Sequence, residues 1–443
     1  MPGGLNTSTT ISPLDAATRY ARGLPDDAAV AVALSGGGDS VGLLAALAET
    51  PCFRIRRIRL AAITVDHGLR PESAGEAAAM ADFCHSLSIP HLIMTWQGDK
   101  PMSGLSEAAR QARYRLLAEG VGRLGANCLL TAHTLDDQLE TVEMRRRRSD
   151  TSPRGLAGIA PAALFFGRLA VHRPFLGVRR AAIRNDLRDR AIGWFDDPSN
   201  DNPRYERVRV RQSGEFALDL DAIAAAAERR VAAAEAAAAY IHTHVRMPVP
   251  LLFELPLPYD DDAGNLTLAT LIAVAGGQTH LPGKEQLVRL RLALQMKSAV
   301  SLGRTVIERR KGVHYIGRDR RNLPSLTLAP GENVDWDGRF RVTRSAGATV
   351  AIEPWVVEEV AKDVPARIAR RAIATLPNCA DLADNYPNMS TIPLLAPFET
   401  VLTSFDRSLA DAMCRLLGRP LFPCFLGSGL ETSPTSGYKE IGG

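Results

Sequence analysis

The stretch ALSGGGDSVGLL, residues 33–44, decides the fold. It ends a run of small apolar residues, 28–34, that is typical of a buried strand, and it leads into a helical pattern from about Asp39. A strand, a tight turn and a helix in this order place backbone N–H groups and a positive helix end at the edge of a sheet, which favours phosphate binding. The alternative is a glycine-rich turn with an ordinary Asp or Ser cap.

The spacing of this loop excludes two common phosphate motifs. A P-loop requires a lysine after its last glycine, and none is present; a dinucleotide fingerprint requires a third glycine where Val41 stands. The remaining pattern, SGGGDS, gives glycines that let the backbone close on phosphate oxygens and two hydroxyl donors, Ser35 and Ser40. Asp39 is the predicted magnesium ligand, since Mg²⁺ prefers carboxylate oxygens.

The composition is that of a soluble globular protein with several domains: 443 residues, 46% hydrophobic and 23% charged. No basic start with an apolar core and no run of about 20 apolar residues is present, so we expect a cytoplasmic protein without membrane segments. The six cysteines are scattered without a C-x-x-C pair, which predicts reduced, mainly buried thiols.

Apolar runs at 28–34, 60–65, 91–95 and 128–132, each followed by a helical pattern, predict an α/β fold with a doubly wound parallel sheet. This domain is expected to cover residues 1–214. An Ala-rich segment, 218–245, predicts a helix in a largely helical domain at 215–298. Short alternating strands with turns at 311–312 and 336–338 predict a small α+β domain at 299–426, and residues 427–443 read as a disordered tail.

Two further loops are expected beside the glycine loop, because the carboxyl ends of parallel strands meet at one edge of a sheet. Asp66 and His67 end the second strand. His133 follows the fourth, and Asp136, Asp137 and Glu140 have the spacing that gathers carboxylates in the first turns of a helix. So many acids would repel each other unless a cation, Mg²⁺ or a substrate ammonium, lay among them; simple dipole partners are the alternative.

Between the loops, EAARQARY places Arg110 and Arg113 on one helix face, where they neutralise phosphate charge or form surface ion pairs. Four motifs stand out in the first half of the chain: SGGGDS, VDHGLRPES, EAARQARY and AHTLDDQLET. They are followed by GLAGI, RPFL and WFDDPSN, and then by Tyr205 and its arginines. Together, and in this order over residues 28–211, these motifs resemble the tRNA(Ile)-lysidine synthetases, members of the PP-loop ATP pyrophosphatase superfamily.

The resemblance implies an ATP-dependent ligase. ATP would adenylate the C2 oxygen of the wobble cytidine in the tRNA(Ile) with a CAU anticodon and release pyrophosphate. The ε-amine of free L-lysine would then attack C2 and displace AMP. The implied cofactors are ATP and Mg²⁺, and the partners are this tRNA and free lysine, without a membrane; a homodimer stays open.

The resemblance also implies roles for individual residues. The spacing does not decide which carboxylate acts as base and which binds lysine. The implied ATP-binding residues are Ser35, Gly36, Gly37, Gly38, Asp39, Ser40, Asp66 and His67, with Asp39 on magnesium; the catalytic candidates are Arg113, His133, Asp136 and Asp137; Asp137 and Glu140 bind lysine; Arg173, Arg204, Tyr205, Arg207, Arg209 and Arg211 bind tRNA. Arg179, Arg180, Arg184, Arg188 and Arg190 are further expected tRNA contacts, with solvated charge as the alternative.

The sequence departs from the family pattern at two places. Val208 stands where the family usually has asparagine, and residues 145–148 form an arginine run in place of a glycine-rich connection, which reads as a loop over the site or a further tRNA contact. Two other functions stay open: another PP-loop tRNA-modifying nucleotidyl transferase, and a catalytically silent RNA-binding protein of this fold. The missing paired cysteines disfavour a thiolation enzyme, and the intact loop and acid set disfavour a silent protein.

Overall fold

The computed structural model describes residues 11–68, 71–98, 100–101, 103–148, 153–196, 203–204, 206–213, 220–355, 363–379 and 388–425. The chain forms two compact units. One comprises Met1–Val231, Thr403–Phe405 and Pro423–Gly443, and the other comprises Ala232–Leu402 and Asp406–Phe422. Tyr205 and the tail predicted at 427–443 lie outside the described residues.

A seven-stranded sheet with the order β17-β5-β6-β4-β1-β2-β3 forms the framework of the first unit. The strands β1, β2, β4 and β6 run parallel, as do β2 and β3, whereas β5 is antiparallel to β6. The four predicted parallel strands are therefore confirmed, and the β5–β6 hairpin was not predicted. The bounds are β1 (Ala29–Ala33), β2 (Arg59–Asp66), β3 (His91–Thr95), β4 (Cys128–Leu130), β5 (Ala162–Phe165), β6 (Leu169–His172) and β17 (Val401–Thr403).

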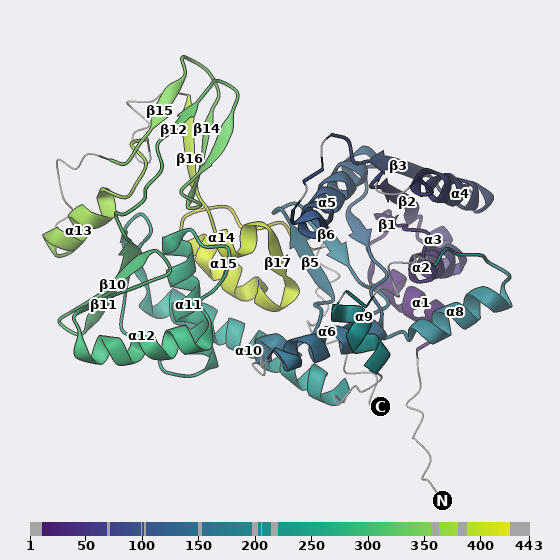
Figure 1. Ribbon diagram of the computed structural model, residues 1–443, viewed down its shortest axis with the longest axis horizontal. Coiled ribbons are helices and arrows are strands. Elements are labelled where there is room, and N and C mark those ends of the chain that lie inside the picture. Colours follow the sequence, from purple (N-terminus) through teal and green to yellow (C-terminus); the bar gives the residue numbers. More distant parts are fainter. Residues whose placement is uncertain are drawn as a thin grey trace, which may run out of the picture. The chain divides into compact units, whose positions relative to one another are not determined.

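The helices of this unit cover the sheet (Figure 1). The chain turns back from β3 to β4, so right-handed crossovers place α5 on the face opposite to α2. Helix α2 packs against α1 and α8. The bounds are α1 (Pro13–Gly23), α2 (Gly38–Glu49), α3 (Pro51–Ile55), α4 (Ser73–Ser86), α5 (Leu105–Arg123), α6 (Leu135–Arg147), α7 (Pro153–Leu156), α8 (Arg180–Asp189) and α9 (Glu206–Ser213).

The strand order has a switch point between β1 and β4. Strands β2 and β3 lie on one side of it, and β4 and β6 lie on the other. Connections leaving β1 and β4 therefore diverge, which opens a crevice beyond the carboxyl ends of the two strands. The glycine loop follows β1 and the His133 loop follows β4, so the topology brings both predicted loops to this crevice.

The remaining elements include mostly antiparallel strands and helices. A five-stranded sheet has the order β7-β8-β11-β10-β9, and a three-stranded sheet has the order β13-β14-β16. The predicted turns at Lys311 and Asp337 connect β10 to β11 and β13 to β14, and both residues have positive φ. The strand bounds are β7 (Arg246–Val249), β8 (Leu252–Leu255), β9 (Ala299–Leu302), β10 (Thr305–Arg310), β11 (Val313–Arg318), β12 (Leu326–Leu328), β13 (Asn333–Trp336), β14 (Phe340–Arg344), β15 (Val350–Ile352) and β16 (Met389–Pro393).

The Ala-rich segment forms the predicted helix, but the segment around it, 215–298, is not helical throughout. The predicted helix appears as α10, but β7 and β8 lie within the segment expected to be largely helical. The helix bounds are α10 (Leu220–His244), α11 (Asp262–Gly276), α12 (Lys284–Met296), α13 (Ala366–Ile373), α14 (Ala396–Glu399) and α15 (Arg407–Leu416). Among the described residues no helix has the length and apolar character that crossing a membrane requires. All six cysteines are free and four are buried, as predicted.

Candidate active site

The glycine loop is held in shape by its own serines. Gly36 has a φ of +84°, a conformation that favours glycine, and Gly37 caps the amino end of α2. The Ser40 hydroxyl donates to the Gly37 carbonyl at 2.9 Å and accepts the Ser35 backbone N–H at 3.1 Å. The loop is thus preorganised, with Ser35 and Ser40 bonded to it as well as facing the pocket.

Two aromatic residues from a distant segment pack on this loop. The Phe195 N–H donates to the Gly36 carbonyl at 2.9 Å, and Phe195 forms an isolated parallel β-bridge with Gly37. A Cβ on Gly36 would lie 3.1 Å from the Phe195 ring, and one on Gly38 would lie 3.4 Å from Trp194. The glycines therefore serve close packing as well as access to phosphate. The WFDDPSN block marked the region, but nothing in its spacing predicted this contact.

The acids of α6 have several different partners. Asp137 forms a capping box with Thr134: its Oδ2 accepts the Thr134 backbone N–H at 2.8 Å and the Thr134 hydroxyl at 2.9 Å. Asp136 Oδ2 accepts the backbone N–H of Arg180 at 2.7 Å, and Glu140 pairs with Arg211 at 2.8 Å. Asp137 is thus a dipole partner, as in the alternative reading, but its second oxygen, Oδ1, faces the guanidinium of Arg180.

Arg180 joins the two predicted loops. Its Nε lies 3.2 Å from Asp39 Oδ2, its Nη2 lies 3.2 Å from Asp137 Oδ1, and its Nη1 lies 3.3 Å from Glu140 Oε1. The cation that we expected among the acids is therefore supplied by the chain itself. Sequence spacing could not show this, because Arg180 belongs to a basic segment 40 or more positions from each α6 acid.

Three other arginines complete what we call the charge cluster. Arg207 approaches Asp137 at 3.7 Å and Glu140 at 3.5 Å, and Arg179 lies 3.6 Å from Asp136. The cluster holds four carboxylates and four guanidiniums: Asp39, Asp136, Asp137 and Glu140 with Arg179, Arg180, Arg207 and Arg211. It carries no net formal charge when all eight groups are ionised.

Burial and the arginines perturb the titration of these groups. Burial raises the pKa of Asp39 to about 6, although the Arg180 guanidinium opposes the shift. Burial also acts to raise the pKa of Asp137, but the Thr134 N–H and Arg180 outweigh it and lower that pKa. For Arg180, burial lowers the pKa, and the carboxylates of Asp137, Asp39 and Glu140 together raise it above its usual value. The guanidinium is therefore a fixed positive charge.

His133 is a neutral imidazole at pH 7. Burial, followed by the positive charges of Arg173 and Arg113, lowers its pKa to about 3. Its Nδ1 lies 3.0 Å from the Thr131 hydroxyl. The ring is therefore held in place and carries no charge at this pH, and it is not part of the lining of the pocket beside the glycine loop.

The loop after β2 has a different environment. Asp66 Oδ1 accepts the Gly68 N–H at 2.8 Å and the Ser73 hydroxyl at 2.7 Å, and these bonds lower its pKa. His67 packs edge-on against Trp96, and burial and the charge of Arg113 lower its pKa. Neither Asp66 nor His67 lines the pocket beside the glycine loop. Arg113 thus influences both this loop and His133.

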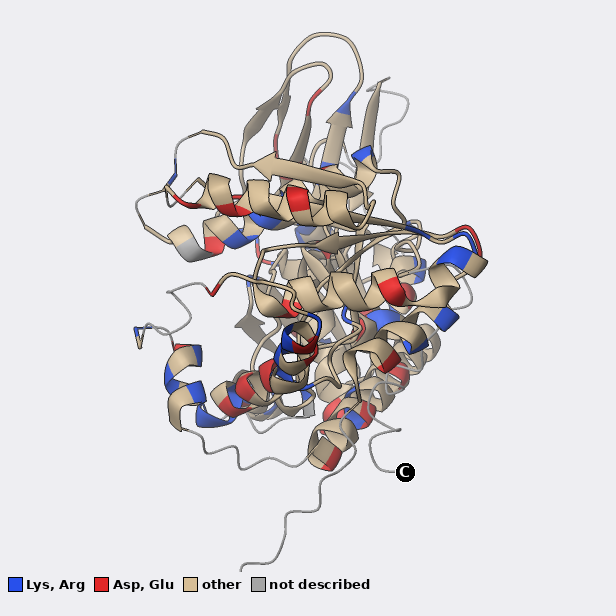
Figure 2. Ribbon diagram, turned by 90° about the vertical axis from the view of Figure 1, so that its right-hand side faces the viewer, with Lys and Arg blue, Asp and Glu red and all other residues tan. Residues whose placement is uncertain are grey.

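The arginines predicted as tRNA contacts lie in three different environments: the pocket, the interior and the exposed surface. Arg207 and Arg211 line the pocket, whereas Arg173 is buried and donates to the Ala160 carbonyl at 2.7 Å. Arg209 is exposed and binds the carbonyls of Pro203 and Arg204, each at 2.9 Å. Basic and acidic positions are interspersed along the helices in view (Figure 2).

The two departures from the family pattern have structural explanations. Val208 is buried on α9, so it fills an apolar position. The arginine run continues α6 as a helix to Arg147, so a loop reading is wrong for these residues. Arg145 binds the Gly155 carbonyl at 3.1 Å, and Glu143 accepts from the next two arginines. Arginines in the last turn of α6 therefore neutralise the almost fully buried carboxylate of Glu143.

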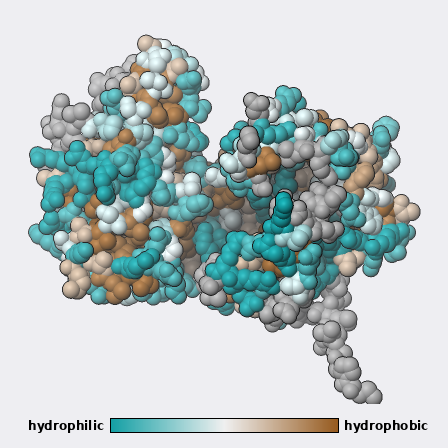
Figure 3. Space-filling view, in the orientation of Figure 1, coloured by the Kyte–Doolittle hydropathy of each residue, from teal (hydrophilic) through white to brown (hydrophobic). Residues whose placement is uncertain are grey.

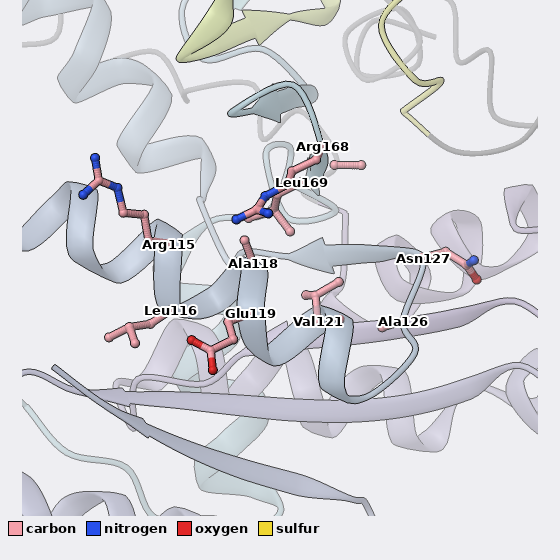
Figure 4. A pocket seen from close by; sticks show the side chains of 11 residues that line it. Arg115, Leu116, Ala118, Glu119, Val121, Ala126, Asn127, Arg168 and Leu169 are labelled. Carbon is pink, nitrogen blue, oxygen red and sulfur yellow. The ribbon is translucent and has the colours of Figure 1, made fainter. Parts of the chain in front are cut away.

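The glycine loop and most of the charge cluster line one pocket of about 820 Å³, whereas Arg179 and the buried Glu140 are not part of its lining. Hydrophilic residues cover the surface over α6 and α9 (Figure 3). A second pocket, of about 650 Å³, is lined by α5, by residues before β4 and by the start of β6 (Figure 4). It lies at the amino ends of the parallel strands, away from the crevice in which such sheets bind ligands.

The residues of the first pocket fit a magnesium ion in one respect. Mg²⁺ is commonly bound by one or two carboxylates together with substrate phosphates, and Asp39 offers a carboxylate beside the glycine loop. Among the described residues there is no group of three or more His, Cys, Asp or Glu side chains arranged to hold a metal by themselves. Any magnesium here would therefore take most of its ligands from phosphate oxygens and water.

Comparisons with known proteins agree with this arrangement. Residues 13–214 match the PP-loop domain family. A tRNA(Ile)-lysidine synthase of Rhizobium meliloti is 38% identical over 93% of this chain and 96% of its own length. One from Mesorhizobium japonicum is 35% identical over 92% and 94%, and one from Brucella ovis is 40% identical over 75% and 78%. The chain belongs to the tRNA(Ile)-lysidine synthase family.

Proposed function

We propose that this chain joins free L-lysine to C2 of the wobble cytidine in the tRNA(Ile) with a CAU anticodon, with ATP as the source of energy. The observation that carries the proposal is the shared pocket: a PP-loop glycine loop after β1 and the acids Asp136 and Asp137 after β4 line the same crevice. The glycine loop would bind the ATP phosphates, and the neighbouring carboxylates would bind an amine. This arrangement suits a reaction that first activates the tRNA base with ATP and then joins an amine to it.

The first step is adenylation. The C2 oxygen of the cytosine attacks the α-phosphate, the bond to the β-phosphate oxygen breaks, and pyrophosphate leaves. The glycine loop and the amino end of α2 would bind the phosphates, and Asp39 would hold magnesium, which would neutralise phosphate charge. Arg113 and neutral His133 are our candidates for stabilising the adenylated cytidine, because Arg113 supplies charge beside an imidazole that can donate or accept a hydrogen bond.

The second step forms the carbon–nitrogen bond. The lysine ε-amine attacks C2, the C2–oxygen bond breaks and AMP leaves. The amine must first lose a proton, since an ammonium group has no lone pair to attack with. Asp137 and Glu140 are the proposed lysine-binding carboxylates, and Asp136 or Asp137 would accept the proton. Arg204, Tyr205 and Arg209 are proposed to contact tRNA together with Arg173, Arg207 and Arg211.

Residues 1–214 are proposed as the catalytic domain, with 215–298 as a helical tRNA-binding or linker domain and 299–426 as a tRNA-recognition domain. The family match over residues 13–214 supports the first assignment. Arginines are frequent in the later segments, including Arg309, Arg310, Arg320 and Arg321 near β10 and β11. Such side chains suit phosphate contacts.

The test measures labelled lysine incorporated into this tRNA(Ile), with an elongator methionine tRNA in parallel. We expect ATP-dependent incorporation into the first alone. Asp39→Ala should abolish it, whereas Asp26→Ala, which removes an exposed acid paired with Arg56, should not. Pyrophosphate release without lysine incorporation would point to another PP-loop nucleotidyl transferase. tRNA binding without either signal would point to a catalytically silent RNA-binding protein.

A further inference from the structure

We infer that Arg180 is an exchangeable counter-ion that holds the lysine-binding carboxylates when ATP is absent and moves to the ATP phosphates when ATP binds. The inference rests on the proposed function of the pocket. It makes Arg180 a positioning residue that couples the two small substrates, because a guanidinium that turns toward the phosphates moves away from the α6 carboxylates.

The position of Arg180 singles it out from the other arginines of the charge cluster. Among the described residues, the ion pairs of Arg207 and Arg211 are with α6 acids, and that of Arg179 is with Asp136. Arg180 alone among these four contacts both Asp39 of the glycine-loop helix and the acids of α6. It therefore lies where the phosphate side and the amine side of the pocket meet.

The geometry of these contacts suits exchange. Each guanidinium nitrogen of Arg180 faces a different carboxylate at 3.2 or 3.3 Å, and charge-assisted hydrogen bonds are usually shorter, about 2.7–2.9 Å. Each of these three carboxylates, Asp39, Asp137 and Glu140, faces a different nitrogen of the fork, so none of the three holds it bidentately. By contrast, Arg211 lies 2.8 Å from Glu140, so this pair can remain when Arg180 leaves.

The root of the Arg180 side chain is fixed by a backbone hydrogen bond, whereas its guanidinium is held by the three longer ion pairs. Its backbone N–H donates to Asp136 at 2.7 Å at the first turn of α8, which fixes the Cα near the pocket. The guanidinium shares the pocket with Ser35, Gly37 and Gly38 of the glycine loop. A rotation of the flexible side chain can therefore redirect the guanidinium toward an anion in that loop without moving the helix.

The charge balance gives this movement a consequence. In the substrate-free charge cluster each carboxylate already has a guanidinium partner, so a lysine ammonium must compete with a resident cation. An anionic triphosphate in the glycine loop offers Arg180 an alternative partner. Its departure leaves Asp137 and Glu140 with less positive charge, so nucleotide binding should strengthen lysine binding, and by reciprocity lysine should strengthen nucleotide binding.

The experiment measures the dissociation constant of labelled lysine by equilibrium dialysis, with and without magnesium and a non-hydrolysable ATP analogue. In the unaltered chain we expect the analogue to tighten lysine binding by roughly tenfold, within the usual range of coupling between sites. Arg180→Gln should bind lysine more tightly than the unaltered chain without the analogue, bind the analogue more weakly, and show no coupling. Loss of a merely structural contact would weaken both ligands instead.

Arg184→Gln is the matched control. Arg184 lines the same pocket on the same helix but pairs with Asp196, so its loss frees neither Asp137 nor Glu140. We expect it to retain the coupling. The inference is overturned if the unaltered chain shows no coupling, if Arg180→Gln retains it, or if Arg184→Gln loses it equally. Lysine incorporation into tRNA by the unaltered chain, measured in parallel, separates failure of this inference from failure of the proposed function.

Discussion

Substitution of Gly42 by alanine should uncouple the glycine loop from the charge cluster. Gly42 lies in α2, and a Cβ there would stand 2.3 Å from Ile183 Cγ2 on α8. Non-bonded carbons sit about 3.5–4.0 Å apart, so the two atoms would have to separate by roughly 1.2–1.7 Å. Helix α2 carries Asp39 and α8 carries Arg180, so the separation acts directly on the contact between them.

The expected effects on stability and on activity differ in size. Overpacking costs about 1–3 kcal/mol, and replacing glycine by alanine within a helix returns up to about 1 kcal/mol. The net loss in the free energy of unfolding should be about 0–2 kcal/mol. A displacement of about 1 Å in a catalytic arrangement can cost on the order of 100-fold in rate. We therefore expect a folded protein whose lysine incorporation is about 100-fold slower.

The assay combines lysine incorporation into tRNA(Ile) with urea unfolding followed by tryptophan fluorescence. Gly122→Ala is the control, because a Cβ at that position in α5 meets no atom within 4 Å. It should leave activity unchanged. Ile183→Ala removes the clashing methyl group, so it should restore activity when combined with Gly42→Ala. Full activity in Gly42→Ala, or no rescue in the double variant, would refute the packing argument.

Three further predictions concern stability and the acid set. Burial lowers the pKa of His172 from 6.5 to about 4. Between these pH values the unfolded chain therefore binds more protons than the folded chain, and about 3 kcal/mol of the free energy of unfolding should be lost as pH falls from 6.5 to 4. His172→Gln should flatten that part of the urea-unfolding profile. Thr134→Ala should cost about 1 kcal/mol and raise the KM for lysine, because Asp137 loses its capping hydroxyl, whereas Thr134→Ser should retain both properties. Asp337→Asn should cost about 3–5 kcal/mol in urea unfolding, because it leaves buried guanidiniums without their carboxylate; Asp335→Asn, at an exposed pair, should cost under about 1 kcal/mol.

The sequence predicted the elements whose signals are local. Strands β1 and β4 were both predicted because each is a short apolar run followed by a helical pattern. The β5–β6 hairpin was missed because its strands have only four residues each and are apolar without alternation, a pattern that short runs share with helices. Strands β7 and β8 are equally short and follow a strong helix signal.

The site divides in the same way. The sequence predicted that the glycine loop and the α6 acids would meet, because strand order alone brings them together. It did not predict that Arg180 would occupy the space between them, since that contact depends on the packing of α8 against α2 through Gly42. The contact of Phe195 with the glycine loop likewise joins two segments that are far apart in the sequence. A contact between elements that are far apart in the chain produces no local sequence pattern from which it could be predicted.

The proposed reaction explains why the resident cation is an arginine. Three carboxylates lie around the Arg180 guanidinium, and a cation among them offsets their mutual repulsion. A lysine at position 180 would place a primary amine, the same chemical group as the substrate nucleophile, beside the activated cytidine. A guanidinium stays protonated at all relevant pH values and so cannot attack. Its planar fork also reaches three carboxylates at once, which a single ammonium point charge would do less well. The residue that keeps the pocket ready for an amine is thus one that cannot react in its place.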